Sequence, residues 1–148
     1  MTDSIRKVAD LRAPVDRVWR ALTDIEAFGA WFGVRLEQPF VCGQTTRGRL
    51  TTPGYEHLRW ESVTVALEPK TLFAFTWHPY AVDPDVDYGA ETPTLVSFSL
   101  EETASGTRLT VTESGFDPLP QHRRDEALRL NTRGWSLQIA NIMAYVGG

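Results

Sequence analysis

The chain has few of the residues that bind metals or form disulfides. Its 148 residues include one cysteine, Cys42, and three histidines. One cysteine cannot form a disulfide within the chain or build a thiolate metal site by itself, and such cysteine usage is typical of a reducing compartment. We interpret Cys42 as a small buried apolar residue rather than a reactive thiol. Because His57, His78 and His122 lie far apart without a paired motif, we expect no metal site among them.

Long hydrophobic runs are also missing. No apolar segment approaches the roughly 20 residues of a membrane-spanning helix, and the N-terminus lacks the apolar core of a signal peptide. We therefore predict a cytoplasmic protein without a membrane partner. A net charge of −4 and a pI of about 5.3 argue against nucleic acid as a partner. Thirteen arginines against two lysines fit a bacterium with a GC-rich genome, which is a correlation and not a mechanism.

Motifs for cofactors are absent as well. Gly29-x-x-x-Gly33 lies within a helical pattern and not after a buried strand, so it is no phosphate cradle, and we expect no nucleotide or other cofactor. The aspartates at 83, 85 and 87 resemble the start of a calcium loop. However, Gly89 comes one place late and the closing glutamate is missing, so we interpret this segment as a solvated acidic loop.

The composition is otherwise that of an ordinary folded domain, with 42% hydrophobic and 23% charged residues. No repeat or flexible linker divides the chain, so we expect a single domain over residues 1–148. Five tryptophans, seven phenylalanines and four tyrosines are many for this length, and each needs apolar surroundings.

The first third of the chain predicts one strand followed by two short helices. Residues 4–11 alternate imperfectly, as a strand does. A first amphipathic helix follows Pro14, with an apolar set at helical spacing: Val15, Val18, Trp19 and Leu22. Thr23 and Glu26 match a capping box for a second helix that ends before Gly33 and carries Ile25, Phe28, Trp31 and Phe32.

From residue 34 to residue 113 the period changes to alternation, which predicts a meander of antiparallel strands. The expected inward faces hold Phe73, Phe75 and Trp77, then Val96, Phe98 and Leu100, then Leu109 and Val111. The apolar parity switches after Trp60, which indicates a β-bulge near Glu61-Ser62.

Residues 119–146 form the longest helical pattern, with an apolar stripe made of Leu128, Trp135, Ile139, Ile142 and Val146. Gly134 inside this helix costs about 1 kcal/mol relative to Ala, so we expect a close backbone contact beside Trp135; a merely tolerated helix glycine is the alternative. The order of elements predicts an α+β fold in which a curved antiparallel sheet wraps around a long C-terminal helix.

Several segments resemble, in order, a known family: APVDRVWRALT (13–23), WFG (31–33), LEP through FTW (67–77), GTRLTV (106–111), SGF (114–116) and GW (134–135). On these segments the chain resembles the activator-of-heat-shock-protein-90-ATPase homologues, a family of the START-like, birch-pollen-allergen-like (SRPBCC) superfamily. The resemblance implies a helix-grip fold with a cavity between the sheet and the C-terminal helix, used for apolar or aromatic small molecules.

The resemblance makes a binding protein for a small hydrophobic or aromatic ligand our first hypothesis. The candidate ligand-binding residues are Trp31, Phe73, Phe75, Trp77, Phe98, Glu113, Trp135 and Ile139. Glu113 shares the parity of Leu109 and Val111 and is expected to face inward, where a carboxylate is costly unless paired; a hydrated position at the rim is the alternative. A dry void of about 300 Å³ would cost on the order of 7 kcal/mol, so we expect a cavity that is small, wet or occupied.

Two other functions stay open at this stage. The first is an enzyme of the polyketide cyclase or aromatase kind, with Glu113, His78, Tyr80 and Arg108 as candidate groups but no recognisable constellation and hence no assigned catalytic residue. The second is a co-chaperone of heat-shock protein 90, the partner in the family's name, although we expect this chain to lack the additional N-terminal domain of the dedicated activators. The segment 77–92 is a candidate lid over the cavity.

Overall fold

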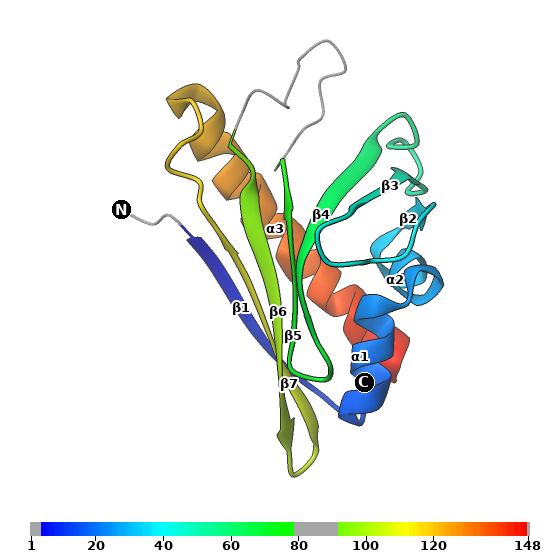
Figure 1. Ribbon diagram of the computed structural model, residues 1–148. Helices are drawn as coiled ribbons and strands as arrows, with labels where there is room; N and C mark the ends of the chain where they lie inside the picture. Colours follow the sequence, from blue (N-terminus) through cyan, green and yellow to red (C-terminus); the bar gives the residue numbers. More distant parts are fainter. Residues whose placement is uncertain (1–3, 79–91, 148) are drawn as a thin grey trace.

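A seven-stranded antiparallel sheet and a long helix dominate the computed structural model, which describes residues 4–78 and 92–147 (Figure 1). The predicted α+β helix-grip fold is confirmed. In chain order the elements are β1 (Ser4–Leu11), α1 (Val15–Thr23), α2 (Ile25–Phe32), β2 (Val34–Leu36), β3 (Thr45–Leu50), β4 (Arg59–Glu68), β5 (Leu72–Trp77), β6 (Thr94–Thr103), β7 (Gly106–Ser114) and α3 (Gln121–Val146).

The strand order explains why two helices follow the first strand. The sheet runs β1-β7-β6-β5-β4-β3-β2, so β1 and β2 lie at opposite edges although they are neighbours among the strands in sequence. The chain must cross the width of the sheet between them, and α1 and α2 make this crossing (Figure 1). The strands β2 to β7 then form the predicted meander, and β1 pairs with β7 along its whole length.

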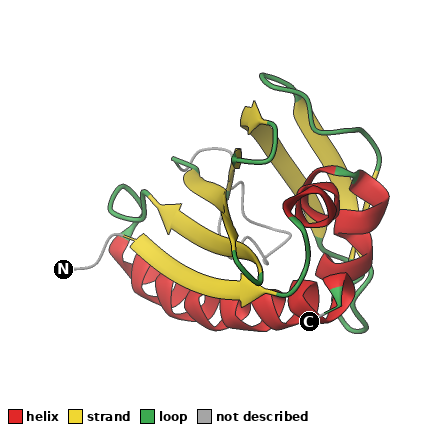
Figure 2. Ribbon diagram, turned by 90° about the horizontal axis from the view of Figure 1, so that it is seen from below, coloured by secondary structure: helices red, strands yellow, loops and turns green. Residues whose placement is uncertain are grey.

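The long helix α3 packs against β1, α1 and α2 and buries Ala127, Trp135, Ile142 and Val146. Figure 2 shows α3 running beside β1, with the rest of the sheet curving away from it toward α1 and α2. Two hydrogen bonds fix the helix to the N-terminal part of the chain. Gln138 Nε2 donates to the Phe32 carbonyl over 3.1 Å, and Arg17 Nη1 donates to the Val146 carbonyl over 3.2 Å.

Aromatic side chains fill the space between the sheet and α3. The predicted inward parity holds on β5, β6 and β7, because Phe73, Phe75, Phe98 and Val111 are buried. The rings contact one another in a continuous series, from Phe40 against Phe73 at 4.7 Å between centroids to Phe98 against Trp135 at 5.7 Å. The aromatic content of the sequence is therefore largely core.

Two local predictions were wrong. Asp24, and not Thr23, caps α2: its side chain accepts from the Ala27 amide over 3.0 Å, while the Thr23 hydroxyl donates back to the Trp19 carbonyl within α1. Thr23 still belongs to the preceding helix, so its hydroxyl is already used when α2 begins.

The β-bulge lies between Thr64 and Ala66 of β4 and not near Glu61-Ser62. Ser62 and Thr64 are polar, yet they are as buried as Trp60, and Ser62 accepts a hydrogen bond from the Trp60 indole over 2.9 Å. Because these inward residues are polar, the apolar pattern of the sequence ends at Trp60, although the inward face of the strand continues to Thr64. The pattern therefore placed the bulge too early in the strand.

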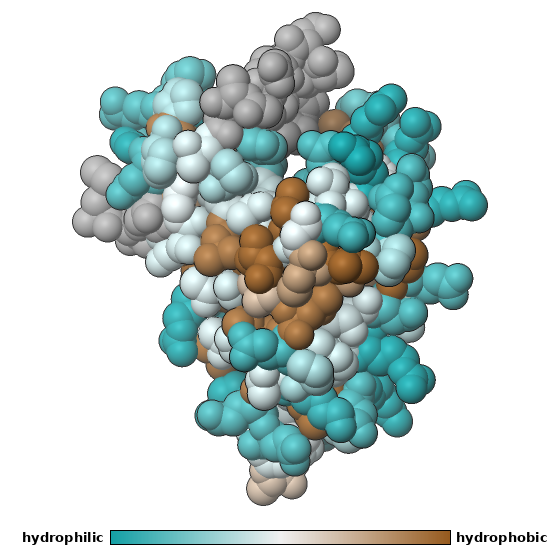
Figure 3. Space-filling view, viewed as in Figure 1, coloured by the Kyte–Doolittle hydropathy of each residue, from teal (hydrophilic) through white to brown (hydrophobic). Residues whose placement is uncertain are grey.

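Apolar side chains also lie on the surface. In the view of Figure 3 an apolar area occupies the middle of the molecule, surrounded by polar residues. The exposed apolar residues of the sheet and its loops include Val41, Leu95 and Val65, which sits at the bulge. Cys42 is exposed as well, so its interpretation as a buried residue was wrong; its backbone forms an isolated parallel β-bridge with Thr64 of β4.

Candidate functional site

Glu113 on β7 is wholly buried. Its predicted inward orientation is confirmed, and the alternative of a hydrated carboxylate at the rim was wrong. On one side it is paired in register with Ile5 of β1, and on the other with Val96 of β6. Both neighbouring residues are buried and apolar, so every polar contact of the carboxylate must come from side chains beyond the strand pairing.

Four hydrogen bonds supply those contacts. Oε2 accepts from Trp77 Nε1 over 2.7 Å and from the Thr94 hydroxyl over 2.6 Å. Oε1 accepts from Trp135 Nε1 over 2.8 Å and from Asn131 Nδ2 over 3.0 Å. A carboxylate offers roughly four lone-pair positions, so this one is fully engaged by neutral donors. Within residues 4–78 and 92–147 no Lys, Arg or His forms an ion pair with it.

Strand ends and one helix face bring these donors together. Trp77 is the last residue of β5, and its register partner Thr94 is the first residue of β6. Both therefore reach the end of the sheet at which β7 carries Glu113. Asn131 and Trp135 lie four residues apart on α3, a spacing that places them on one face of the helix.

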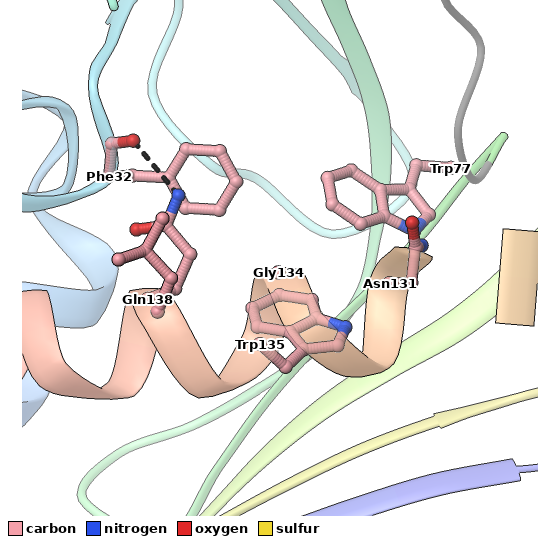
Figure 4. A pocket seen from close by; sticks show the side chains of 7 residues that line it. Phe32, Trp77, Asn131, Gly134, Trp135 and Gln138 are labelled. Carbon is pink, nitrogen blue, oxygen red and sulfur yellow. Dashed lines mark hydrogen bonds between the residues drawn. The ribbon is translucent and has the colours of Figure 1, made fainter. Parts of the chain in front are cut away.

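A cavity of about 120 Å³ lies beside this network. The residues lining it are Phe32, Trp77, Asn131, Gly134, Trp135, Leu137 and Gln138. Figure 4 shows Phe32 and Trp77 on opposite sides, with Trp135 and Gly134 of α3 between them. Glu113 is not part of the lining; it holds the N–H edges of both indoles from behind.

Gly134 contributes open space. A Cβ atom at this position would meet no heavy atom within 4 Å, so the expected close backbone contact beside Trp135 was wrong. The glycine faces the cavity, which a larger side chain would narrow.

The structure separates the predicted ligand-binding residues into two groups. Trp77 and Trp135 line the cavity, and Glu113 positions both of them. Phe73, Phe75 and Phe98 lie in the core, where Phe75 contacts Trp77 and Phe98 contacts Trp135, and Ile139 packs partly buried against the same core. Trp31 donates to the Ala21 carbonyl over 2.7 Å and so joins α2 to α1.

Sequence reasoning missed Phe32, Leu137 and the polar lining residues Asn131 and Gln138. Asn131, Gly134 and Gln138 of α3 are spaced three and four residues apart and so share a helix face, beside that of Trp135. Two amides and a glycine beside the stripe of a buried tryptophan are a signal that could have been noticed.

Of the residues considered for an enzyme, Arg108 forms no hydrogen bond or ion pair with Glu113 in the part of the chain that the structure describes. Arg108 is at the surface, where it pairs with Asp10 over 3.1 Å and with Glu101 over 3.5 Å. His78 directly follows Trp77, and its buried Nδ1 makes no hydrogen bond within the described residues. Tyr80, the aspartates at 83, 85 and 87, and most of the segment considered as a lid lie outside those residues.

Among residues 4–78 and 92–147 there is no group of three His, Cys, Asp or Glu side chains placed to hold a metal ion. None of the helices in this part of the chain combines the length and the apolar character needed to cross a bilayer.

Comparison with known proteins decides the family. The model of the family described as Activator of Hsp90 ATPase homolog 1-like protein matches residues 12–147. The chain belongs to this family. The predicted resemblance is thereby confirmed over nearly the whole sequence, while a search of curated proteins found no match.

Solved structures share the fold of this chain. Protein MLL2253 from Mesorhizobium loti is 21% identical, with a TM-score of 0.76 and coverage of 96% of this chain and 95% of that one. The Aha1 protein of Colwellia psychrerythraea, solved as a dimer, is 15% identical with a TM-score of 0.74, over 99% and 96% of the two chains. DynU16, from the dynemicin biosynthetic locus, is 26% identical with a TM-score of 0.75. This chain is covered over 98% of its length but spans only 47% of DynU16.

Proposed function

We propose that this family member binds a small apolar or aromatic molecule in the cavity between α3 and the end of β5. The observation that carries the proposal is that a buried carboxylate, Glu113, holds two aromatic side chains of the cavity wall in place. Trp77 and Trp135 line the cavity and donate their N–H groups to Glu113. Indoles fixed in this way keep their rings in place without a ligand, so binding requires little ordering of side chains.

The volume limits what the cavity can hold. An engineered apolar cavity of about 150 Å³ in another protein takes up benzene. At about 120 Å³ the present cavity accepts one ring or a group of similar size. Burying about 100 Å² of apolar ligand surface yields roughly 2.5 kcal/mol gross, so a tight ligand needs further contacts outside the cavity.

A fluorescence titration tests the proposal, because two tryptophans line the cavity. We expect toluene and indole derivatives to change the tryptophan emission of the wild-type protein in a saturable way. Gly134→Leu places a side chain in the cavity and is expected to abolish this response. Ser136→Leu is the matched control, since Ser136 is exposed on the same helix.

Two results would contradict ligand binding at this site. One is the absence of a saturable response to any compound in a broad set of aromatic and aliphatic molecules. The other is an equal response in Gly134→Leu and Ser136→Leu, which would place the binding site elsewhere.

The contacts of Glu113 bear on the enzyme hypothesis. A general base must accept a proton from its substrate, but all roughly four lone-pair positions of this carboxylate already accept hydrogen bonds from the protein. The arrangement therefore supports a positioning role for Glu113. The chaperone partner in the family's name remains a separate prediction, tested by measuring whether the protein raises the ATP turnover of heat-shock protein 90.

A further inference from the structure

The cavity wall presents electron-rich groups to a ligand. Every side-chain nitrogen of the lining donates to another part of the protein: both indoles and Asn131 to Glu113, and Gln138 to the Phe32 carbonyl. The ring faces remain as the contact surface. Within residues 4–78 and 92–147 no hydrogen bond to the Asn131 Oδ1 atom is formed, so this acceptor is also available at the lining.

Three rings lie close enough together to act on one bound group. The ring centroids of Trp77 and Trp135 are 5.7 Å apart, and Phe32 is 6.3 Å from each. The faces of aromatic rings carry the negative part of the quadrupole and attract cations, with tryptophan the strongest.

Among the residues that the structure describes, the buried carboxylate has no positive partner. Glu113 is 0% exposed, and its four contacts are neutral donors. Buried charges in proteins are normally paired. Arg124, a cation on α3, is engaged elsewhere, with Asp125 and the Asp117 carbonyl. Glu113 lies directly behind the cavity wall, so its negative charge favours a positively charged ligand in the cavity.

We propose that the ligand of this cavity is an organic cation whose charge is covered by small apolar groups, such as a quaternary ammonium or an N-alkylated aromatic amine. This inference rests on the proposed binding function and specifies the ligand's charge. The same wall disfavours carboxylates and phosphates, because both indole N–H groups already donate to Glu113 and none of the lining residues is a cation.

A pair of probes of the same shape separates charge from apolar character. Phenyltrimethylammonium and tert-butylbenzene differ by one atom, a cationic nitrogen in place of a carbon. We expect wild-type protein to bind the cation at least tenfold more tightly in a tryptophan fluorescence titration. Equal or tighter binding of tert-butylbenzene overturns the inference about charge and leaves the proposed function standing. Binding of neither probe contradicts both.

Glu113→Gln tests the source of the preference, since it removes the charge and nearly preserves the shape. We expect the affinity for both probes to fall, because one carboxylate oxygen that accepts two hydrogen bonds is replaced by an NH2 group, and the ratio of the two affinities to fall at least fivefold. A purely structural role of Glu113 would weaken both probes equally and leave the ratio unchanged, which would overturn the assignment.

A second variant keeps the test decisive if Glu113→Gln does not fold. Phe32→Leu removes one ring face from the lining but keeps an apolar side chain in a partly buried position. We expect it to weaken the binding of both probes, and to weaken that of phenyltrimethylammonium at least threefold more. Equal weakening of the two probes would contradict a role of the ring faces in recognising the charge.

Discussion

At Glu113, hydrogen bonds from β5, β6 and α3 replace the water that burial removes from a carboxylate. Each bond to an ionised group is worth roughly 1.5–3 kcal/mol, and a donor left unsatisfied inside a protein costs about 1–3 kcal/mol. Thr94, Trp77 and Trp135 would lose their acceptor together if the carboxylate were removed. One side chain thus determines whether three elements have satisfied polar groups.

Glu113→Ala is therefore expected to lower the free energy of unfolding by about 3 kcal/mol or more. Urea denaturation followed by circular dichroism measures this change. Glu126→Ala, at an exposed position of α3, is the control and should stay within about 0.5 kcal/mol of the wild type. Similar stabilities of the two variants would show that water replaces the carboxylate at little cost.

Two helical glycines should respond in opposite ways to the same change. At Gly134 a Cβ meets nothing within 4 Å, so Gly134→Ala is expected to gain about 1 kcal/mol of stability from helix propensity. At Gly29 of α2 a Cβ would lie 2.2 Å from the Val34 carbonyl oxygen, so Gly29→Ala is expected to lose about 1–3 kcal/mol through overpacking. Thermal unfolding of both variants checks the signs; destabilisation by Gly134→Ala would mean that the helix needs this glycine.

Among the elements, the turn between β4 and β5 is tied to α1 by a surface ion pair. Lys70 lies in this turn with a left-handed backbone, φ 64°, and its ammonium is 2.7 Å from the Asp16 carboxylate in the first turn of α1. The hydrogen bond to Asp16 and then its negative charge raise the pKa of Lys70 above the ordinary value of 10.5. Because the pKa is higher in the folded protein, the pair stabilises the fold while Lys70 is protonated, and this contribution is lost as the pH rises through the raised pKa.

Lys70→Gln should accordingly lower Tm slightly near neutral pH, and the difference from the wild type should shrink toward zero at a pH above the raised pKa. Since both side chains are exposed, the effect is small and screened by salt. Calorimetry from pH 7 to a pH above the raised pKa, at low and high ionic strength, measures it. A Tm difference that stays constant even above the raised pKa would point to backbone effects in the turn instead.

More of the secondary structure than of the candidate site could be predicted from the sequence. Apolar spacing located β1 and the helices, and parity placed Phe73, Phe98 and Glu113 on inward faces, because period and burial are properties of a single segment. The partners of Glu113 are 18 to 36 residues away along the chain. Their meeting depends on strand register and on the rotation of α3, which no local pattern encodes.

At the scale of the whole molecule, the cavity of about 120 Å³ is not a sealed void. One of its lining residues, Leu137, is 63% exposed, so the cavity opens to solvent and water can enter it. The sequence predicts a cavity that is small, wet or occupied, since a dry void of about 300 Å³ would cost on the order of 7 kcal/mol. The cavity of about 120 Å³ is smaller than such a void and is open to water.

Gly134→Leu should trade function for stability in this molecule as a whole. It replaces a poor helix former and fills apolar space, so we expect unfolding to cost about 1 kcal/mol more than in the wild type while ligand binding is lost. Urea denaturation and the fluorescence titration measure the two effects on one sample. A variant that is both less stable and unable to bind would instead indicate strain at this position.

The place of α3 in the sequence sets an order in time. The strands that carry Phe73, Phe75 and Phe98 are synthesised before the helix that covers them. The apolar face of the sheet is therefore exposed to solvent while these strands emerge from the ribosome. Until the helical turn with Asn131 and Trp135 has emerged, Glu113 also lacks two of its four hydrogen-bond donors. Nascent chains halted ahead of α3 are thus the species of this protein that most need a chaperone's protection from aggregation.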